Sequence, residues 1–183
     1  MNHDVWKSFA ANEVSHSMAH YLTTIQELKE SRGYARVSDV AKALEVTKGS
    51  VSVQIKHLKE KGFVIEDENR FLTLTQVGES VAREVIYSRR VLIQLFKEVL
   101  GISAELAETD ACKMEHLLSH ETSSKLLGLV QLLQSEDADA RKLLRRFKTF
   151  HFSCPTLDEC KLCVDQCLNE VEPCRHVGAS RRS

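Results

Sequence analysis

Hydrophobic residues recur at helical intervals along most of the chain. In residues 17–31 they stand at positions 18, 21, 22, 25 and 28, which lie on one face of an α-helix. Ser17 suits the N-cap of this helix, and Gly33 suits the position just beyond its end. Residues 38–45 and 50–61 are expected to form two shorter helices.

The pattern then changes from helical to extended. Residues 63–65 and 71–74 are short apolar runs typical of β-strands, and Asp67, Glu68 and Asn69 between them favour a turn. Three helices, the last two close together, followed by a β-hairpin give the element order of a winged helix-turn-helix. We therefore expect a DNA-binding domain at the start of the chain.

Helical spacing returns after the hairpin. Thr75 can cap a long helix over residues 76–99, and another helix is expected at about 104–118. Residues 121–134 are too apolar for a lone surface helix, so we expect them to be buried in a bundle or against a second subunit. The predicted fold class is mainly α, with an N-terminal winged helix-turn-helix followed by an all-helical domain.

Composition narrows the class of protein. No apolar run approaches the ~18 residues of a membrane span, and the N-terminus lacks the basic start and apolar stretch of a secretory signal. We therefore expect a cytoplasmic protein with no membrane contact. No catalytic constellation and no cofactor-binding loop stands out, and the pair Cys160 and Cys163 lacks a thioredoxin-like context, so enzyme activity is not expected.

Charge is balanced overall but unevenly distributed. The net charge is −1, yet residues 48–61 carry four lysines against one glutamate, and residues 141–148 carry five basic residues. Basic segments on a near-neutral chain favour a directed contact with a polyanion, although charged helix surfaces also serve solubility alone.

A candidate metal motif lies near the middle of the chain. Cys112, Glu115 and His116 stand at i, i+3 and i+4, which places their side chains on one face of a helix. A thiolate, a carboxylate and an imidazole together suit a first-row transition metal. The alternative is a buried cysteine beside two surface polar residues.

Three segments together resemble the diphtheria-toxin-repressor (DtxR/MntR) family of metal-dependent transcriptional regulators. They are GYARVSDVAKALEVTKGSVS at 33–52, FVIEDENRFLTLTQVG at 63–78 and CKMEHLLS at 112–119. The resemblance, which covers about residues 16–147, implies a homodimer that binds a palindromic DNA operator and usually represses metal-uptake genes. The expected domains are an N-terminal extension (1–15), the winged helix-turn-helix (16–75), a helical dimerisation and metal-binding domain (76–147) and a cysteine-rich extension (148–183).

The resemblance also implies a ligand set. The primary metal site of the family falls on His20, Cys112, Glu115 and His116, and His20 is a departure because relatives usually have Met or Asp there. The first-helix acidic ligand of the manganese-sensing branch falls on Thr23. The ligands of a second metal fall on Arg90 or its neighbour Arg89 and on Gln94, while Glu108 remains where a ligand can stand. Since arginine cannot bind a metal, we expect one ion in this domain. A permanent arginine charge in place of the second ion is a further hypothesis.

The cysteine in the set bears on the identity of the metal. A thiolate shifts preference away from Mn²⁺ and toward Fe²⁺, Co²⁺ or Zn²⁺. In the family that is resembled, cysteine at this position goes with iron sensors. We expect Fe²⁺ as the cellular metal, with Zn²⁺, Co²⁺ or Mn²⁺ as possible substitutes.

The third helix is the expected DNA reader. Small polar residues at its start would face the major groove, and basic residues there and in the wing would contact phosphates. The candidate DNA-binding residues are Thr47, Lys48, Gly49, Ser50, Ser52, Gln54, Lys56 and Arg70.

The end of the chain lies outside the resemblance and holds five cysteines within 21 residues, at Cys154, Cys160, Cys163, Cys167 and Cys174. In a reducing compartment such a cluster favours metal binding over disulfides. Four thiolates suit either a [4Fe–4S] cluster or Zn²⁺. The alternative function is therefore a redox- or iron–sulfur-cluster-sensing regulator in which these cysteines are the main sensor.

Overall fold

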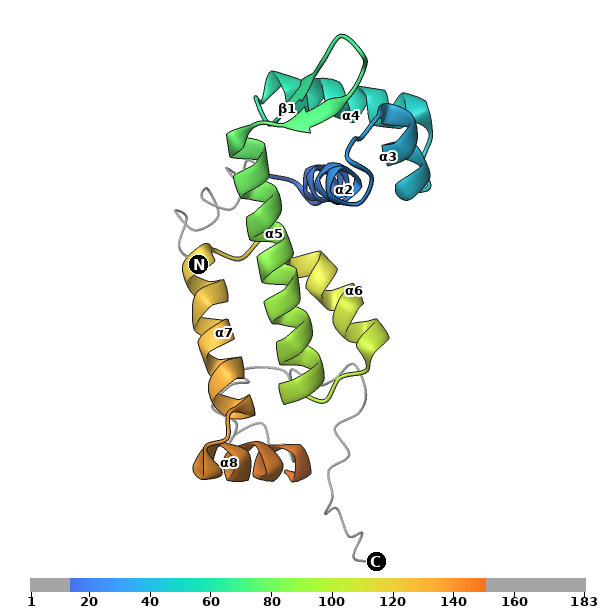
Figure 1. Cartoon of the computed structure of the whole chain (residues 1–183). Helices are drawn as coiled ribbons and strands as arrows, with labels where there is room; N and C mark the ends of the chain where they lie inside the picture. Colours follow the sequence, from blue (N-terminus) through green and yellow to red (C-terminus); the bar gives the residue numbers. More distant parts are fainter. Residues whose placement is uncertain (1–13, 151–183) are drawn as a thin grey trace, which may run out of the picture.

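The first part of the molecule, predicted to be a DNA-binding domain, is formed by three helices and a short hairpin. A computed structural model describes residues 14–150. Helix α2 (His16–Arg32) is followed by α3 (Val37–Ala43), α4 (Lys48–Glu60) and the strands β1 (Val64–Glu66) and β2 (Leu72–Leu74). The strands pair antiparallel, with Ile65 opposite Thr73. This arrangement, seen at the top of Figure 1, confirms the predicted winged helix-turn-helix.

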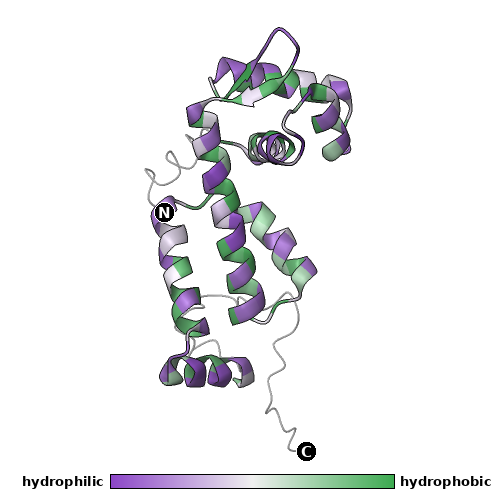
Figure 2. Ribbon diagram, in the orientation of Figure 1, coloured by the Kyte–Doolittle hydropathy of each residue, from purple (hydrophilic) through white to green (hydrophobic). Residues whose placement is uncertain are grey.

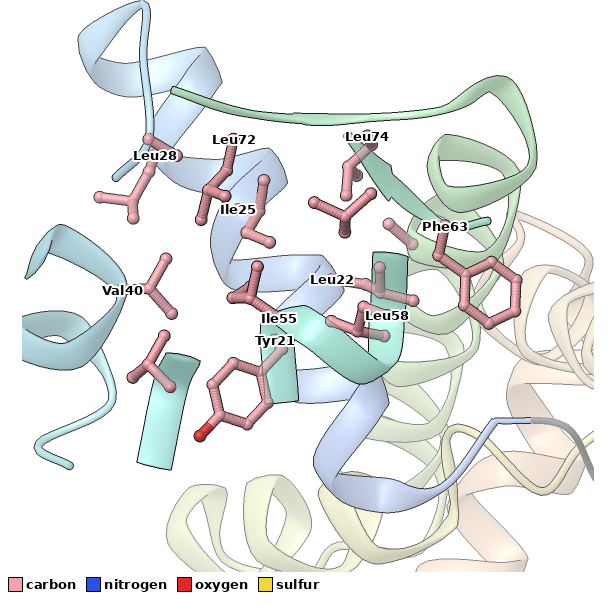
Figure 3. Close-up of a cluster of buried hydrophobic side chains, with 14 of the residues drawn as sticks. Tyr21, Leu22, Ile25, Leu28, Val40, Ile55, Leu58, Phe63, Leu72 and Leu74 are labelled. Atoms are coloured by element: carbon pink, nitrogen blue, oxygen red, sulfur yellow. The ribbon is translucent and has the colours of Figure 1, made fainter. Parts of the chain in front are cut away.

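One apolar core holds this part together. Leu22 and Ile25 of α2 are fully buried among side chains from the other two helices and from the hairpin, as Figure 3 shows. Leu58 of α4 and Leu72 of β2 belong to the same core. The core explains the i, i+3, i+4 spacing of apolar residues in α2, because that face packs against it.

The rest of the described chain is helical and is built around α5 (Gln76–Gln94). This helix runs from the hairpin through the molecule, with α6 on one side and α7 on the other (Figure 1). It continues into a π-helix, η1 (Leu95–Val99), and is followed by α6 (Ala104–Met114), α7 (His120–Gln134) and α8 (Ala138–Thr149). Thr75 caps α5 as predicted, accepting a hydrogen bond from the amide of Gly78 at 3.1 Å.

The second core is small. Within the described residues it consists of buried Val99, Val130 and Leu133, with Leu95 and Leu144 packed against them. Large apolar side chains of α7 and α8 remain exposed, and Figure 2 shows hydrophobic positions alternating with hydrophilic ones on both helices. The exposed residues are Leu129, Leu132, Leu143 and Phe147. A single chain therefore leaves an apolar surface on these two helices.

No helix within residues 14–150 is long and apolar enough to cross a membrane.

Several predicted helix ends differ from the structure, and three of the differences lie at the start of α2, the start of α4 and the end of α6. The first helix begins at His16, not at 17, because Ser15 and not Ser17 is the N-cap. The third begins at Lys48, not at 50, because the Thr47 hydroxyl accepts from the amide of Ser50. The helix at 104–118 ends at Met114 and continues as turns.

Candidate metal centre and DNA-binding surface

The first two turns of α2 carry two histidines, and the second histidine lies against α6. His16 and His20 are one turn apart, and their rings meet edge to face with centroids 4.5 Å apart. The Nε2 atom of His20 lies 3.2 Å from the Sγ atom of Cys112 on α6, across 92 residues of sequence. The predicted pair of His20 and Cys112 is therefore in contact.

A third donor joins this pair. His16, His20 and Cys112 each offer one ligand atom, and these three atoms all lie within 4.8 Å of one another. Sequence reasoning missed His16 because it placed the start of α2 one residue too late. The available signal was the i, i+4 spacing of His16 and His20, which puts both rings on one face of a helix.

His116 lies beside the same group but outside it. Its ring centroid is 5.1 Å from that of His16. His116 follows Glu115, the C-cap of α6, so the Cys112–Glu115–His116 motif spans the end of the helix instead of lying within it. Glu115 keeps helical backbone angles, but the cluster of donor atoms around Cys112 includes neither Glu115 nor His116.

Glu115 has a different partner from the one predicted. Its carboxylate is fully buried and accepts two hydrogen bonds from Arg89 of α5. Arg89 donates through Nε to Oε2 and through Nη2 to Oε1, the latter at 3.0 Å. Burial would lower the pKa of Arg89, but the carboxylate of Glu115 more than offsets this effect and holds it above its usual value. Both carboxylate oxygens of Glu115, which was predicted to bind metal, thus accept hydrogen bonds from the permanent cation Arg89.

Two of these histidines, His20 and His116, have lowered pKa values, which favours the neutral form that binds metals. Burial lowers the pKa of His20, and the nearby charges of His16, Arg89 and His116 lower it further. Burial and His16 lower the pKa of His116 in the same way. Neutral imidazole is the ligand form, so both rings have a lone pair available at neutral pH.

This donor set fits a divalent transition metal. Imidazole nitrogen and thiolate sulfur are ligands that Zn²⁺, Co²⁺ and Fe²⁺ accept readily. If Cys112 were only a buried core residue, two histidines of another helix would not be expected within 4.8 Å of its sulfur.

The other positions at which the resemblance places metal ligands, Thr23 and Arg89 or Arg90, belong to no cluster of metal ligands within the described residues. Thr23 is buried, and its hydroxyl donates to the backbone carbonyl of His20 at 3.2 Å. Either Arg89 or Arg90 was expected in place of a histidine ligand. Arg89 donates a hydrogen bond to Glu115, whereas Arg90 is exposed.

The start of α4 forms an exposed polar surface. Among the candidate DNA-binding residues, Gln54 is half-buried and the others are exposed. Two of the hydroxyls also serve the helix itself, since Thr47 is the N-cap and Ser52 donates to the carbonyl of Lys48 at 2.9 Å.

A basic groove of about 420 Å³ lies between α3, α4 and the hairpin. Lys56 and Arg70, both predicted, line it together with Lys59 and Arg36. Arg36 was not predicted, and its guanidinium lies 4.4 Å from the centroid of the Phe71 ring, which orients it. Arg70 has a positive φ of 64°, so the tip of the hairpin turns there.

The five cysteines from Cys154 to Cys174 lie outside the described residues. Their binding of an iron–sulfur cluster or Zn²⁺ stays a prediction.

Two family models match the chain. "Iron dependent repressor, N-terminal DNA binding domain" matches residues 13–72, and "Iron dependent repressor, metal binding and dimerisation domain" matches residues 75–139. The HTH-type transcriptional regulator MntR of Lysinibacillus sphaericus (strain C3-41) is 34% identical over 135 residues, covering 74% of this chain and 96% of that protein. MntR of Bacillus subtilis (strain 168) is 34% identical over 127 residues, covering 69% of this chain and 89% of that protein.

Solved structures show the same fold. IdeR of T. acidophilum is similar with a TM-score of 0.53 and 28% identity, over 63% of this chain and 54% of that one. The manganese regulator SloR is similar in fold, with a TM-score of 0.56 and 23% identity, over 62% of this chain and 53% of that one. The chain thus spans about half the length of these two solved chains.

Proposed function

We propose, from the premise that the chain belongs to the diphtheria-toxin-repressor (DtxR/MntR) family, that it represses metal-uptake genes in response to Fe²⁺. Membership makes it a metal-dependent helix-turn-helix regulator of transcription. The proposal adds the cellular metal, the class of regulated genes and the residues that connect the two.

The contact between His20 and Cys112 carries the proposal. His20 lies on α2, which belongs to the DNA-binding core, whereas Cys112 lies on α6 of the helical part. A metal ion bonded to both would set the orientation of the DNA-binding part. Two recognition helices reach successive major grooves only when they are about 34 Å apart, so an ion at this point would select the binding geometry.

The donor chemistry supports iron over manganese. Cys112 supplies a thiolate, and Thr23 replaces the acidic residue of manganese sensors with a buried hydroxyl that serves its own helix. Mn²⁺ prefers carboxylate and water ligands, so this site disfavours it relative to Fe²⁺, Co²⁺ and Zn²⁺.

A homodimer on a palindromic operator completes the proposal. The family model for the second half of the chain includes dimerisation, and the exposed apolar residues of α7 and α8 offer a surface for it. The exposed residues at the start of α4 would enter the major groove. Lys56, Arg36 and Arg70 would contact phosphates from the groove beside it.

Single alanine variants test the coupling. An operator is first selected in vitro from random duplexes with Fe²⁺-loaded protein under anaerobic conditions. His20→Ala and Cys112→Ala should each remove the dependence of operator binding on added Fe²⁺, measured by fluorescence anisotropy. His57→Ala, an exposed histidine on α4, controls for surface changes on the DNA-binding domain. Metal-dependent binding that persists in both alanine variants would disprove the mechanism.

A further inference from the structure

We propose that His16 is a ligand of the regulatory metal ion and that Glu115 is not. The ion would be bound by the imidazoles of His16, His20 and His116 and by the thiolate of Cys112. This inference rests on the proposed function only in placing the ion between α2 and α6. It replaces a carboxylate that the sequence motif predicts with a histidine outside that motif.

The position of His16 supports the first half. Its donor atom lies within 4.8 Å of those of His20 and Cys112, a group that Glu115 does not join. Its ring contacts the rings of both His20 and His116. Although His16 is exposed, it stands in the first turn of a helix capped by Ser15, so its backbone is already ordered for binding.

The partner of Glu115 supports the second half. Both carboxylate oxygens accept hydrogen bonds from one guanidinium, in the two-point geometry that makes arginine–carboxylate pairs strong. Ligation by Glu115 would compete with this pair, because the ion and half-buried Arg89 would share the same two oxygens. Cys112 lies near enough to Arg89 to contribute, after Glu115, to the raised pKa of Arg89.

The charge and chemistry of the resulting set define the metal it takes. Three neutral imidazoles and one thiolate around a divalent ion leave one positive charge, while Glu115 and Arg89 neutralise each other. Four nitrogen and sulfur donors suit tetrahedral Zn²⁺ or Co²⁺ and accept Fe²⁺, and without an oxygen donor Mn²⁺ has no preferred ligand. The set therefore predicts a metal-specificity filter that disfavours Mn²⁺.

Cobalt reports directly on this coordination. Full-length protein is titrated anaerobically with Co²⁺, and the visible d–d bands of tetrahedral Co²⁺ with the thiolate charge-transfer band are recorded. A background with serine at the five cysteines from Cys154 to Cys174 removes other thiolates. His16→Ala should weaken Co²⁺ binding by at least about tenfold, since even indirect partners of ligands cost that much. His120→Ala, another exposed histidine, should bind as the parent does.

Glu115→Gln separates the two candidate ligand sets. It should keep the Co²⁺ bands and lose less than about threefold in affinity, because no ligand is removed and the amide oxygen still accepts one hydrogen bond from Arg89. Its folding is verified by circular dichroism before titration. Nitrogen NMR of the histidine rings in the Zn²⁺-loaded parent gives the same answer without that variant, because three rings, assigned by substitution, should show metal-bound shifts.

The outcomes are distinct. Unchanged Co²⁺ affinity in His16→Ala, or its loss in folded Glu115→Gln to the extent seen in Cys112→Ala, overturns this inference and leaves the proposed function standing. Retained affinity in both His20→Ala and Cys112→Ala removes the site between α2 and α6 and with it the proposed function.

Discussion

Arg89 lies beside the candidate metal site and forms an ion pair with buried Glu115. The resemblance to the family led us to expect a metal-binding histidine at Arg90 or at its neighbour Arg89. A guanidinium is always charged and cannot be removed by metal depletion. Arg89 thus places a permanent positive charge beside the candidate site.

Arg89→Gln should destabilise the protein. The change would leave the buried carboxylate of Glu115 without a charged partner, at a cost of about 3 kcal/mol, and protonation of the carboxylate would limit the loss. The free energy of unfolding from urea denaturation measures it. Arg90→Gln, one residue along and exposed, serves as the control and should change stability by less than about 0.5 kcal/mol. Equal losses in the two variants would contradict a structural role for the Arg89–Glu115 pair.

At the residue scale the sequence predicts contacts between neighbours better than contacts across the fold. The spacing of Cys112, Glu115 and His116 indicated metal chemistry, and the family pattern added His20. The pairing of Arg89 with Glu115 joins residues 26 apart on different helices, so no local spacing could reveal it. His16 was missed because one serine was taken as the cap in place of another.

At the scale of elements, the junction between the hairpin and α5 depends on one glycine. A side-chain carbon at Gly78 would lie 2.1 Å from the backbone carbonyl oxygen of Phe63, which is closer than any real contact. The same carbonyl accepts hydrogen bonds from the amide and hydroxyl of Thr75. The first turn of α5 is therefore pressed against the hairpin, which fixes the direction in which the helix leaves the DNA-binding part.

Gly78→Ala should disturb this junction. Backbone atoms would have to shift, at a cost of about 1–3 kcal/mol. Gly128 of α7 is a matched control, since a side-chain carbon there meets nothing within 4 Å. Gly128→Ala should stabilise the protein by about 0.5–1 kcal/mol, because alanine favours a helix over glycine. Thermal unfolding of both variants decides the matter, and a Gly78→Ala protein as stable as the parent would contradict the close approach.

The order of elements was predictable, but several of their ends were not. The three helices and the hairpin follow from apolar spacing and turn residues, and the core in Figure 3 buries the residues that carried this pattern. Helix ends depend on which of several hydroxyls caps the first turn. Ser15, Thr47 and Ser119 each cap a helix that begins one or two residues before its predicted start.

At the scale of the whole molecule, the candidate site joins the two parts that the family models match separately. His16 and His20 lie in the part matched as DNA-binding, and Cys112 and His116 in the part matched as metal binding and dimerisation. Helix α5 packs against both α2 and α6 and provides a covalent connection between them. An ion at this point would add a second connection, so metal and DNA would act on one orientation of the same two parts.

This shared orientation makes the effects of metal and DNA reciprocal. If Fe²⁺ or Co²⁺ raises operator affinity by some factor, operator must raise metal affinity by the same factor, which is typically about 5–150-fold. Anaerobic Co²⁺ titrations with and without operator duplex measure one side, and anisotropy titrations with and without Co²⁺ measure the other. A scrambled duplex of equal length at the same ionic strength controls for non-specific phosphate binding, which is salt-dependent. His20→Ala should abolish both effects together. Reciprocal effects that persist at full size in folded His20→Ala would mean that the ion acts elsewhere than between α2 and α6.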